Sequence, residues 1–220
     1  MLVRAAPPGC RCFDSFGILT DADIEALSEA GYLVAGRYAQ NLQAAEVDSL
    51  FERNMGLMLI GESREPGWVP SADTGKIDAE AILQAVARLK LPAGSTSWVD
   101  VEGPHQSAAT LAADARAVIA HVDAFTTALV AGGGDPGAYL GYQTLLTSSE
   151  WYARPRLNRY GKSGSRLLDR TGLVVEPARG FSWVQVLPFD LQVPGCGVPI
   201  DAGILARDYE GGAVACIWAS

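Results

Sequence analysis

The sequence predicts a single (β/α)8 barrel over residues 1–220, with its core at about 11–210 and an irregular last third. Short, almost entirely apolar segments alternate with amphipathic helical segments, which is typical of a parallel sheet covered by helices. Eight strand candidates are present, the number that closes such a barrel. A doubly wound open sheet is the alternative. Against it, no G-x-G-x-x-G motif follows the first strand and no P-loop occurs.

The first half of the chain alternates most clearly. We expect strands at residues 11–18, 32–39, 57–61 and 97–103, separated by helices at 20–31, 44–55 and about 75–90. Thr20 is the predicted N-cap of the first helix, because Asp21 and Asp23 follow it as an acidic first turn. Gly31 ends that helix.

The second half is less regular. A helix is expected at about residues 108–131, followed by a strand at 137–143 and a short helix at 145–152. The remaining strand candidates lie at 157–161 and 181–187, and one begins at 198–201. An apolar tail at 213–218 closes the chain, and residues 162–180 have no clear pattern.

Acidic residues fall at three of the predicted strand ends. Asp100 and Glu102 close the fourth strand on one face, because side chains two apart in a strand point the same way. Asp14 lies in the first strand and Asp201 in the eighth. In a closed barrel these two strands are neighbours and the fourth lies across the mouth, so we expect the four carboxyl groups to converge. Such a cluster favours glycoside hydrolysis, because mutual repulsion keeps one carboxyl protonated as the acid.

The order of these motifs also resembles a known family. FD in the first strand, GRY in the second, DVE in the fourth, GAYLGYQ in the fifth, W-x-Q at residues 183–185 and ID at 200–201 together resemble the glycoside-hydrolase-like barrel family related to family 25 lysozymes (muramidases). The resemblance covers roughly residues 11–210 and implies an enzyme acting on N-acetylated cell-wall glycan of the peptidoglycan type.

The resemblance implies a role for each candidate residue. Glu102 would protonate the glycosidic oxygen, Asp100 would orient the acetamido group or stabilise the developing positive charge, and Asp14 would complete the catalytic group. The substrate-binding candidates are Asp201, Gln185, Tyr38 and Tyr142. Trp68, on a long loop, is added to them as a stacking platform for a sugar.

Structural explanations stay open for several of these residues. Asp100 and Glu102 are alternatively a strand-end pair that caps backbone groups or binds Arg37. Asp14 and Asp201 are alternatively structural hydrogen-bond acceptors. Trp98 and Trp183 are expected in the core, and His105 in a surface loop.

Composition excludes other functions. The net charge of −8 argues against nucleic-acid binding. With two histidines we expect no transition-metal centre and no cofactor, while Ca²⁺ or Mg²⁺ at the acidic mouth stays open. The four cysteines are expected as free or packed thiols, with a disulfide between the chain ends as the alternative.

No run of residues is long and apolar enough for a transmembrane helix, and the N-terminus lacks the apolar core of a signal peptide. We therefore expect a protein made in the cytoplasm and released to act on the cell wall, as a phage or prophage product is. A catalytically silent glycan-binding module of a larger assembly is the main alternative function. An unrelated barrel enzyme acting on a small metabolite is a third. The oligomeric state is left open.

Overall fold

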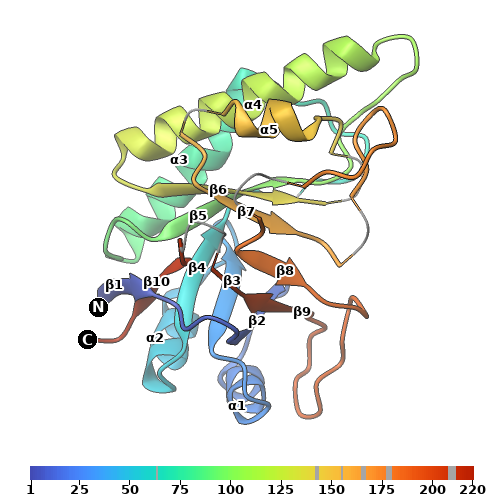
Figure 1. Cartoon of the computed structure of the whole chain (residues 1–220). Coiled ribbons are helices and arrows are strands. Elements are labelled where there is room, and N and C mark those ends of the chain that lie inside the picture. Colours follow the sequence, from blue (N-terminus) through green and yellow to red (C-terminus); the bar gives the residue numbers. More distant parts are fainter. Residues whose placement is uncertain (63, 142–143, 155, 165–166, 177–179, 208–211) are drawn as a thin grey trace.

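The computed structural model describes residues 1–220 except 63, 142–143, 155, 165–166, 177–179 and 208–211. Within the described part, eight strands form a closed ring with helices outside it (Figure 1). Their order around the ring is β4, β3, β2, β9, β8, β7, β6 and β5, and pairing of β4 with β5 closes it. The predicted barrel is confirmed, and the open doubly wound sheet is excluded.

The elements lie close to the predicted segments. The ring strands are β2 (Arg11–Ser15), β3 (Val34–Tyr38), β4 (Gly56–Ile60), β5 (Thr96–Val101), β6 (Asp135–Leu140), β7 (Arg159–Lys162), β8 (Trp183–Gln185) and β9 (Asp201–Leu205). The helices are α1 (Asp21–Glu29), α2 (Ala44–Glu52), α3 (Ala72–Arg88), α4 (Leu111–Ala131) and α5 (Ser148–Tyr152). In the described part of the chain, no α-helix separates β7, β8 and β9, so the last third is irregular as predicted. No helix there is long and apolar enough to cross a membrane.

Local capping explains where several helices begin. Thr20 accepts a hydrogen bond from the Asp23 amide, and the Asp23 carboxylate accepts from the Thr20 amide, so α1 starts with a capping box. Ser71 and Thr74 form the same arrangement at the start of α3. The prediction of Thr20 as an N-cap is confirmed.

Two large tryptophans fill the inside of the barrel. Trp98 on β5 and Trp183 on β8 are buried, with ring centroids 5.1 Å apart. Space for them comes from glycines: a Cβ at Gly137 would lie 2.6 Å from the Trp98 ring, and one at Gly161 would lie 3.0 Å from the Trp183 ring. Alternate residues of β5, such as Val99 and Val101, instead join the core shared with the helices. The expected core role of both tryptophans is confirmed.

The direction of β9 corrects the expectation of a parallel sheet. β9 runs antiparallel to both of its neighbours, β2 and β8. An antiparallel neighbour needs no helical crossover, which fits a connection from β8 to β9 without an α-helix. The reversal places the start of β9 beside the end of β2, where Asp201 pairs in register with Asp14.

The two ends of the chain pair with each other beside the start of β4. β1 (Leu2–Ala5), which the sequence did not predict, runs antiparallel to β10 (Ala215–Trp218), and β10 reaches β4 through Ile217 and Leu57. The four cysteines are buried and free, which confirms the expected thiols and excludes a disulfide.

Candidate active site

The predicted acidic residues converge at one rim of the barrel. Asp14 lies near the end of β2 at the barrel mouth, where it pairs with Asp201 on β9. Its carboxyl group also interacts electrostatically with that of Glu102. Asp100 lies on β5, across the ring, and Glu102 follows one residue after that strand. Asp100 and Glu102 interact with each other, as their shared strand face predicts. The predicted convergence of carboxyl groups from both sides of the ring is therefore confirmed.

Asp100 is held in an almost dry position. Its residue is 7% exposed, and the Tyr38 hydroxyl donates a hydrogen bond to Oδ2 at 3.3 Å. Oδ1 is buried without a hydrogen-bond partner among the described residues. Burial first, and then the charges of Glu102 and Asp14, raise the pKa of Asp100 well above its usual value. Asp100 is therefore held against ionisation in the folded protein.

Asp14 and Asp201 are linked by one amide side chain. Gln185 Nε2 donates to Asp14 Oδ1 at 2.8 Å and lies 3.5 Å from Asp201 Oδ2. The Tyr139 hydroxyl donates to Gln185 Oε1, which fixes the amide so that its N–H groups face the acids. Burial raises the pKa of Asp14 well above its usual value, although the bond from Gln185 lowers it in part. Burial also raises the pKa of Asp201.

Glu102, like Asp201, is only partly buried, whereas Asp14 and Asp100 are buried. Burial, followed by the charge of Asp201, raises the pKa of Glu102 to about 7. Its side chain lies directly over the backbone of Gly141, where an added Cβ would be 1.9 Å from Glu102 Cγ. No basic side chain pairs with Glu102 in the described ranges. A carboxyl with this pKa supplies both its acid and its base form near neutral pH.

Arg37 does not bind the acidic pair, which corrects one structural alternative. It is fully buried, pairs through Nε with Glu46 on α2, and donates to the carbonyl of Gly17. Its charge does lower the pKa of Asp14 in part. Asp100 and Glu102 thus have no arginine partner among the described residues, and each carboxyl group disfavours ionisation of the other.

A cavity of about 280 Å³ opens beside Asp14 and Asp201, and Asp100 and Glu102 are not among the residues that line it. Asp14, Asp201 and Tyr38 line it, together with Phe16 and Asp190, which the sequence analysis did not select. Phe16 packs edge-on against Tyr38, with centroids 5.5 Å apart. A lining of carboxyl groups, aromatic rings and apolar side chains is suited to a polyhydroxylated ring with apolar faces.

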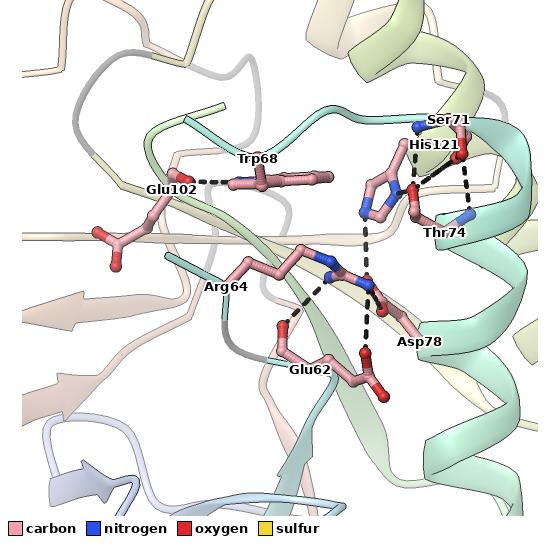
Figure 2. A network of polar contacts seen from close by, with 8 residues as sticks. All are labelled: Glu62, Arg64, Trp68, Ser71, Thr74, Asp78, Glu102 and His121. Atoms are coloured by element: carbon pink, nitrogen blue, oxygen red, sulfur yellow. Dashed lines mark hydrogen bonds and ion pairs between the residues drawn. The ribbon is translucent and has the colours of Figure 1, made fainter. Parts of the chain in front are cut away.

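The other candidate residues take varied positions. Gln185 is buried, so it contacts the acids rather than solvent. Tyr142 lies outside the described residues. Trp68 lies on the loop before α3, and its indole N–H donates to the backbone carbonyl of Glu102 at 2.7 Å (Figure 2). Sugar contact by Trp68 stays a prediction. His105 is exposed in a loop, as expected.

Sequence reasoning missed Tyr139 and the network that holds Trp68. Tyr139 pairs in register with Asp100, so alternation along β6 places it on the inner face. Arg64, Asp78 and His121, which surround Trp68, carry no local signal, because they are brought together only by the packing of a loop and two helices. No group of three or more His, Cys, Asp or Glu that could hold a metal occurs among the described residues.

The ring of strands and the carboxyl cluster at its rim define a glycoside hydrolase-like barrel. Residues 25–170 match the sequence model of the Rv2525c-like, glycoside hydrolase-like domain, and the chain belongs to this family. No curated protein sequence matches the chain.

Solved structures share this fold at low sequence identity. The Tat-secreted protein Rv2525c of Mycobacterium tuberculosis, in complex with HEPES, is 14% identical with a TM-score of 0.66, covering 96% of this chain and 99% of that one. A family 25 glycosyl hydrolase from Bacillus anthracis is 12% identical with a TM-score of 0.50, covering 91% and 90%. The modular autolysin LytC of Streptococcus pneumoniae, solved with a synthetic peptidoglycan ligand, is 10% identical with a TM-score of 0.57, covering 89% of this chain and 46% of LytC. This chain thus shares its fold with a family 25 glycosyl hydrolase and with a modular autolysin.

Proposed function

We propose that the protein hydrolyses N-acetylated cell-wall glycan of the peptidoglycan type, with Glu102 as the general acid. The observation that carries the proposal is the pKa of Glu102, raised to about 7 in a site where three other carboxyl groups gather. At neutral pH a large share of Glu102 is protonated, which an acid must be before it can protonate a leaving group. The likeness to a family 25 hydrolase and to LytC supports the choice of substrate.

Each residue takes a defined part in the proposed reaction. Glu102 gives its proton to the glycosidic oxygen as the bond to the anomeric carbon breaks. Asp100 orients the acetamido group of the sugar and faces the positive charge that develops on the ring. Water adds to the anomeric carbon and its proton returns to Glu102, which completes the cycle. The charge of Asp201, which reaches Glu102, keeps the local potential negative and so stabilises that positive charge, while Asp14 lines the sugar site beside it.

The test is loss of turbidity of purified cell walls, followed by identification of new reducing ends. Glu102→Gln keeps the size of the side chain and removes the proton, so we expect lysis to fall by about 10²–10⁴-fold while wall binding is retained. Glu25→Gln changes an exposed acid on α1 and serves as the control, with lysis unchanged.

The same assay separates this proposal from a silent glycan-binding module. A wild-type protein that binds walls but releases no reducing ends from any wall preparation would support the module. Equal lysis by the wild type and Glu102→Gln would contradict the role of Glu102. The proposal also places the protein at the cell wall, after release from the cytoplasm.

A further inference from the structure

The loop between β4 and α3 is bonded to the segment that carries Glu102. Trp68 Nε1 donates to the Glu102 carbonyl at 2.7 Å, the Gly67 amide donates to the Gly103 carbonyl at 2.7 Å, and the His105 amide donates to the Trp68 carbonyl at 2.7 Å. The strand β5 ends at Val101, so no barrel strand holds the Glu102 carbonyl. Hydrogen bonds from the loop therefore replace those between strands at Glu102, the residue proposed as the acid.

The indole of Trp68 is itself held between two side chains. The Arg64 guanidinium lies 4.9 Å from the centroid of the indole ring, and the His121 ring lies 4.9 Å away at 63° (Figure 2). Both side chains also contact the carboxylate of Asp78. Arg64 donates from NH1 to Asp78 Oδ2 at 2.8 Å and from NH2 to Asp78 Oδ1. His121 Nε2 lies 3.3 Å from Asp78 Oδ2. Because the side chains of Asp78 and His121 are fully buried, this arrangement has little freedom to move.

Two packed helices fix the position of Asp78 and His121. Asp78 lies on α3 and His121 on α4, and a Cβ at Gly75 would lie 2.0 Å from the His121 carbonyl, so the helices touch at this point. Thr74 Oγ1 is 2.9 Å from His121 Nδ1 and also caps α3 with Ser71. The contacts thus run from the helix pair, through the indole, to the peptide of Glu102.

We propose that Trp68 is a positioning residue for Glu102, and that the Asp78-centred network of Arg64 and His121 holds Trp68 in place for that task. The inference rests on the proposed function of Glu102 as the acid. A hydrogen bond to the carbonyl of the acid fixes its backbone, and displacement of a catalytic group by about 1 Å costs up to about 10²-fold in rate. In this role Trp68 acts on the reaction through Glu102 and not through the sugar.

The titration of Glu102 reports on this role independently of activity. The groups that interact with its carboxyl are Asp14 on β2, Tyr38 on β3, Asp100 on β5, Tyr139 on β6 and Asp201 on β9. All of them lie outside the loop that carries Trp68, so we expect them to keep their positions when Trp68 is changed. A shift of the Glu102 titration therefore reports solvent reaching its carboxyl.

The test compares Trp68→Phe with the wild type. Phenylalanine keeps an aromatic ring between Arg64 and His121 but has no N–H for the Glu102 carbonyl. We expect kcat for wall lysis to fall about 10-fold with KM changed less than about 2-fold. In a ¹³C NMR titration of the side-chain carboxyl, assigned with Glu102→Gln, we expect the midpoint of Glu102 to fall from about 7 toward its ordinary value of 4.5.

Two further variants separate positioning from general destabilisation. Replacement of Trp68 by benzothienylalanine keeps the ring size and both ring contacts and removes only the donor, so it should reproduce the kcat loss with an unchanged melting temperature. Arg64→Lys keeps a charge for Asp78 but loses the planar fork, so a smaller effect in the same direction is expected. Trp151→Phe is the matched control, because Trp151 is fully buried and its N–H has no partner within the described ranges.

Distinct results would overturn the inference. An unchanged kcat and an unchanged Glu102 midpoint in both Trp68 variants would show that the bond does not position the acid. A rise in KM with unchanged kcat would assign Trp68 to sugar binding instead. Absence of lysis by the wild type would refute the proposed function alone, and the NMR midpoint would still decide the positioning role.

Discussion

The acids at the barrel mouth are held in two different ways. Asp14 and Asp201 lie in paired strands, opposite each other in register, and share the amide of Gln185. Glu102 lies beyond the end of β5, where it depends on a hydrogen bond from Trp68 and on the bare backbone of Gly141. Pairing between β2 and β9 holds Asp14 and Asp201 in fixed positions, whereas Glu102 lies beyond the last residue of β5 and is only partly buried, so it can exchange its proton. The reactive group is thus expected at the loop-held position, with the strand-held acids setting the potential around it.

Among changes that leave Glu102 itself in the sequence, the largest effect is expected from filling the space beneath its side chain. In Gly141→Ala the new Cβ would lie 1.9 Å from Cγ and 2.4 Å from Cδ of Glu102. A flexible side chain yields before the barrel does, so Glu102 should swing away while the fold survives. We expect wall lysis to fall by about 10²-fold with a nearly unchanged melting temperature.

A glycine elsewhere provides the control for that change. A Cβ at Gly197 would meet only Asp23 Oδ1, at 3.3 Å, on the α1 side of the barrel. Gly197→Ala should therefore leave lysis intact. Full activity in Gly141→Ala would mean that Glu102 is not needed in this position.

A smaller effect is expected from changing a strand-held acid and observing the loop-held one. Glu102 must be protonated to act, so the rate should fall as pH rises above about 7. The charge of Asp201 contributes to that raised pKa, because a negative neighbour disfavours ionisation. Asp201→Asn removes the charge, so the pKa of Glu102 should fall and the basic limb of the kcat/KM profile should move to lower pH.

The position of the basic limb is measured from pH 4 to 9 on soluble glycan. Asp48→Asn, at an exposed position on α2, removes one negative charge far from any strand end and should leave the profile unchanged. Equal shifts in both variants would show a general effect of net charge rather than a contact between the two kinds of acid.

The smallest effect is expected on stability, at the strand-held Asp100. Burial and the neighbouring carboxyl charges raise its pKa in the folded state, so between its unfolded and folded pKa values the folded protein holds more protons. Stability conferred by this group is present below pH ~4 and declines as pH rises. Asp100→Asn removes that decline and can still accept from Tyr38. We expect a gain on the order of 1 kcal/mol at pH 8, about 2–4 °C in Tm, that disappears near pH 4.

An acid with the opposite shift makes the comparison sharper. Hydrogen bonds from Ser49 and Arg53 lower the pKa of the exposed Asp21, so its stabilisation is present above pH ~4 and is lost as pH falls. Asp21→Asn should therefore lower Tm at pH 8 and have no effect at low pH. Thermal melts of both variants across pH would contradict this account if the two changes had the same sign.

Sequence reasoning succeeded where the signal was local. The alternation of Trp98, Val99, Asp100 and Val101 predicts which side chains face inward, because the period of a strand is two residues. Thr20 and Asp23 predicted the start of their helix, because a capping box is a pattern within four neighbouring residues. Tyr139 was missed because the sequence did not show where this strand begins and ends, and the choice of Tyr142, outside the described residues, stays a prediction.

Sequence reasoning failed where partners are distant along the chain. Asp78 and His121 are 43 residues apart and meet only because α3 and α4 touch at Gly75. β1 had no expected partner, because it pairs with the opposite end of the chain. The antiparallel direction of β9 was also missed. It follows from a connection between β8 and β9 without an α-helix, which no local pattern in the sequence predicts.

By itself the sequence determined which strands carry acids and toward which face of each strand they point, because neighbouring residues on one strand alternate by simple geometry. Only the tertiary structure decided which acid can serve as a proton donor. That choice depends on burial and on charges across the ring. They raise the pKa of Glu102 to about 7, and they raise the pKa values of Asp14 and Asp100 well above their usual values, which opposes ionisation of both. Those quantities exist only once the strands have closed.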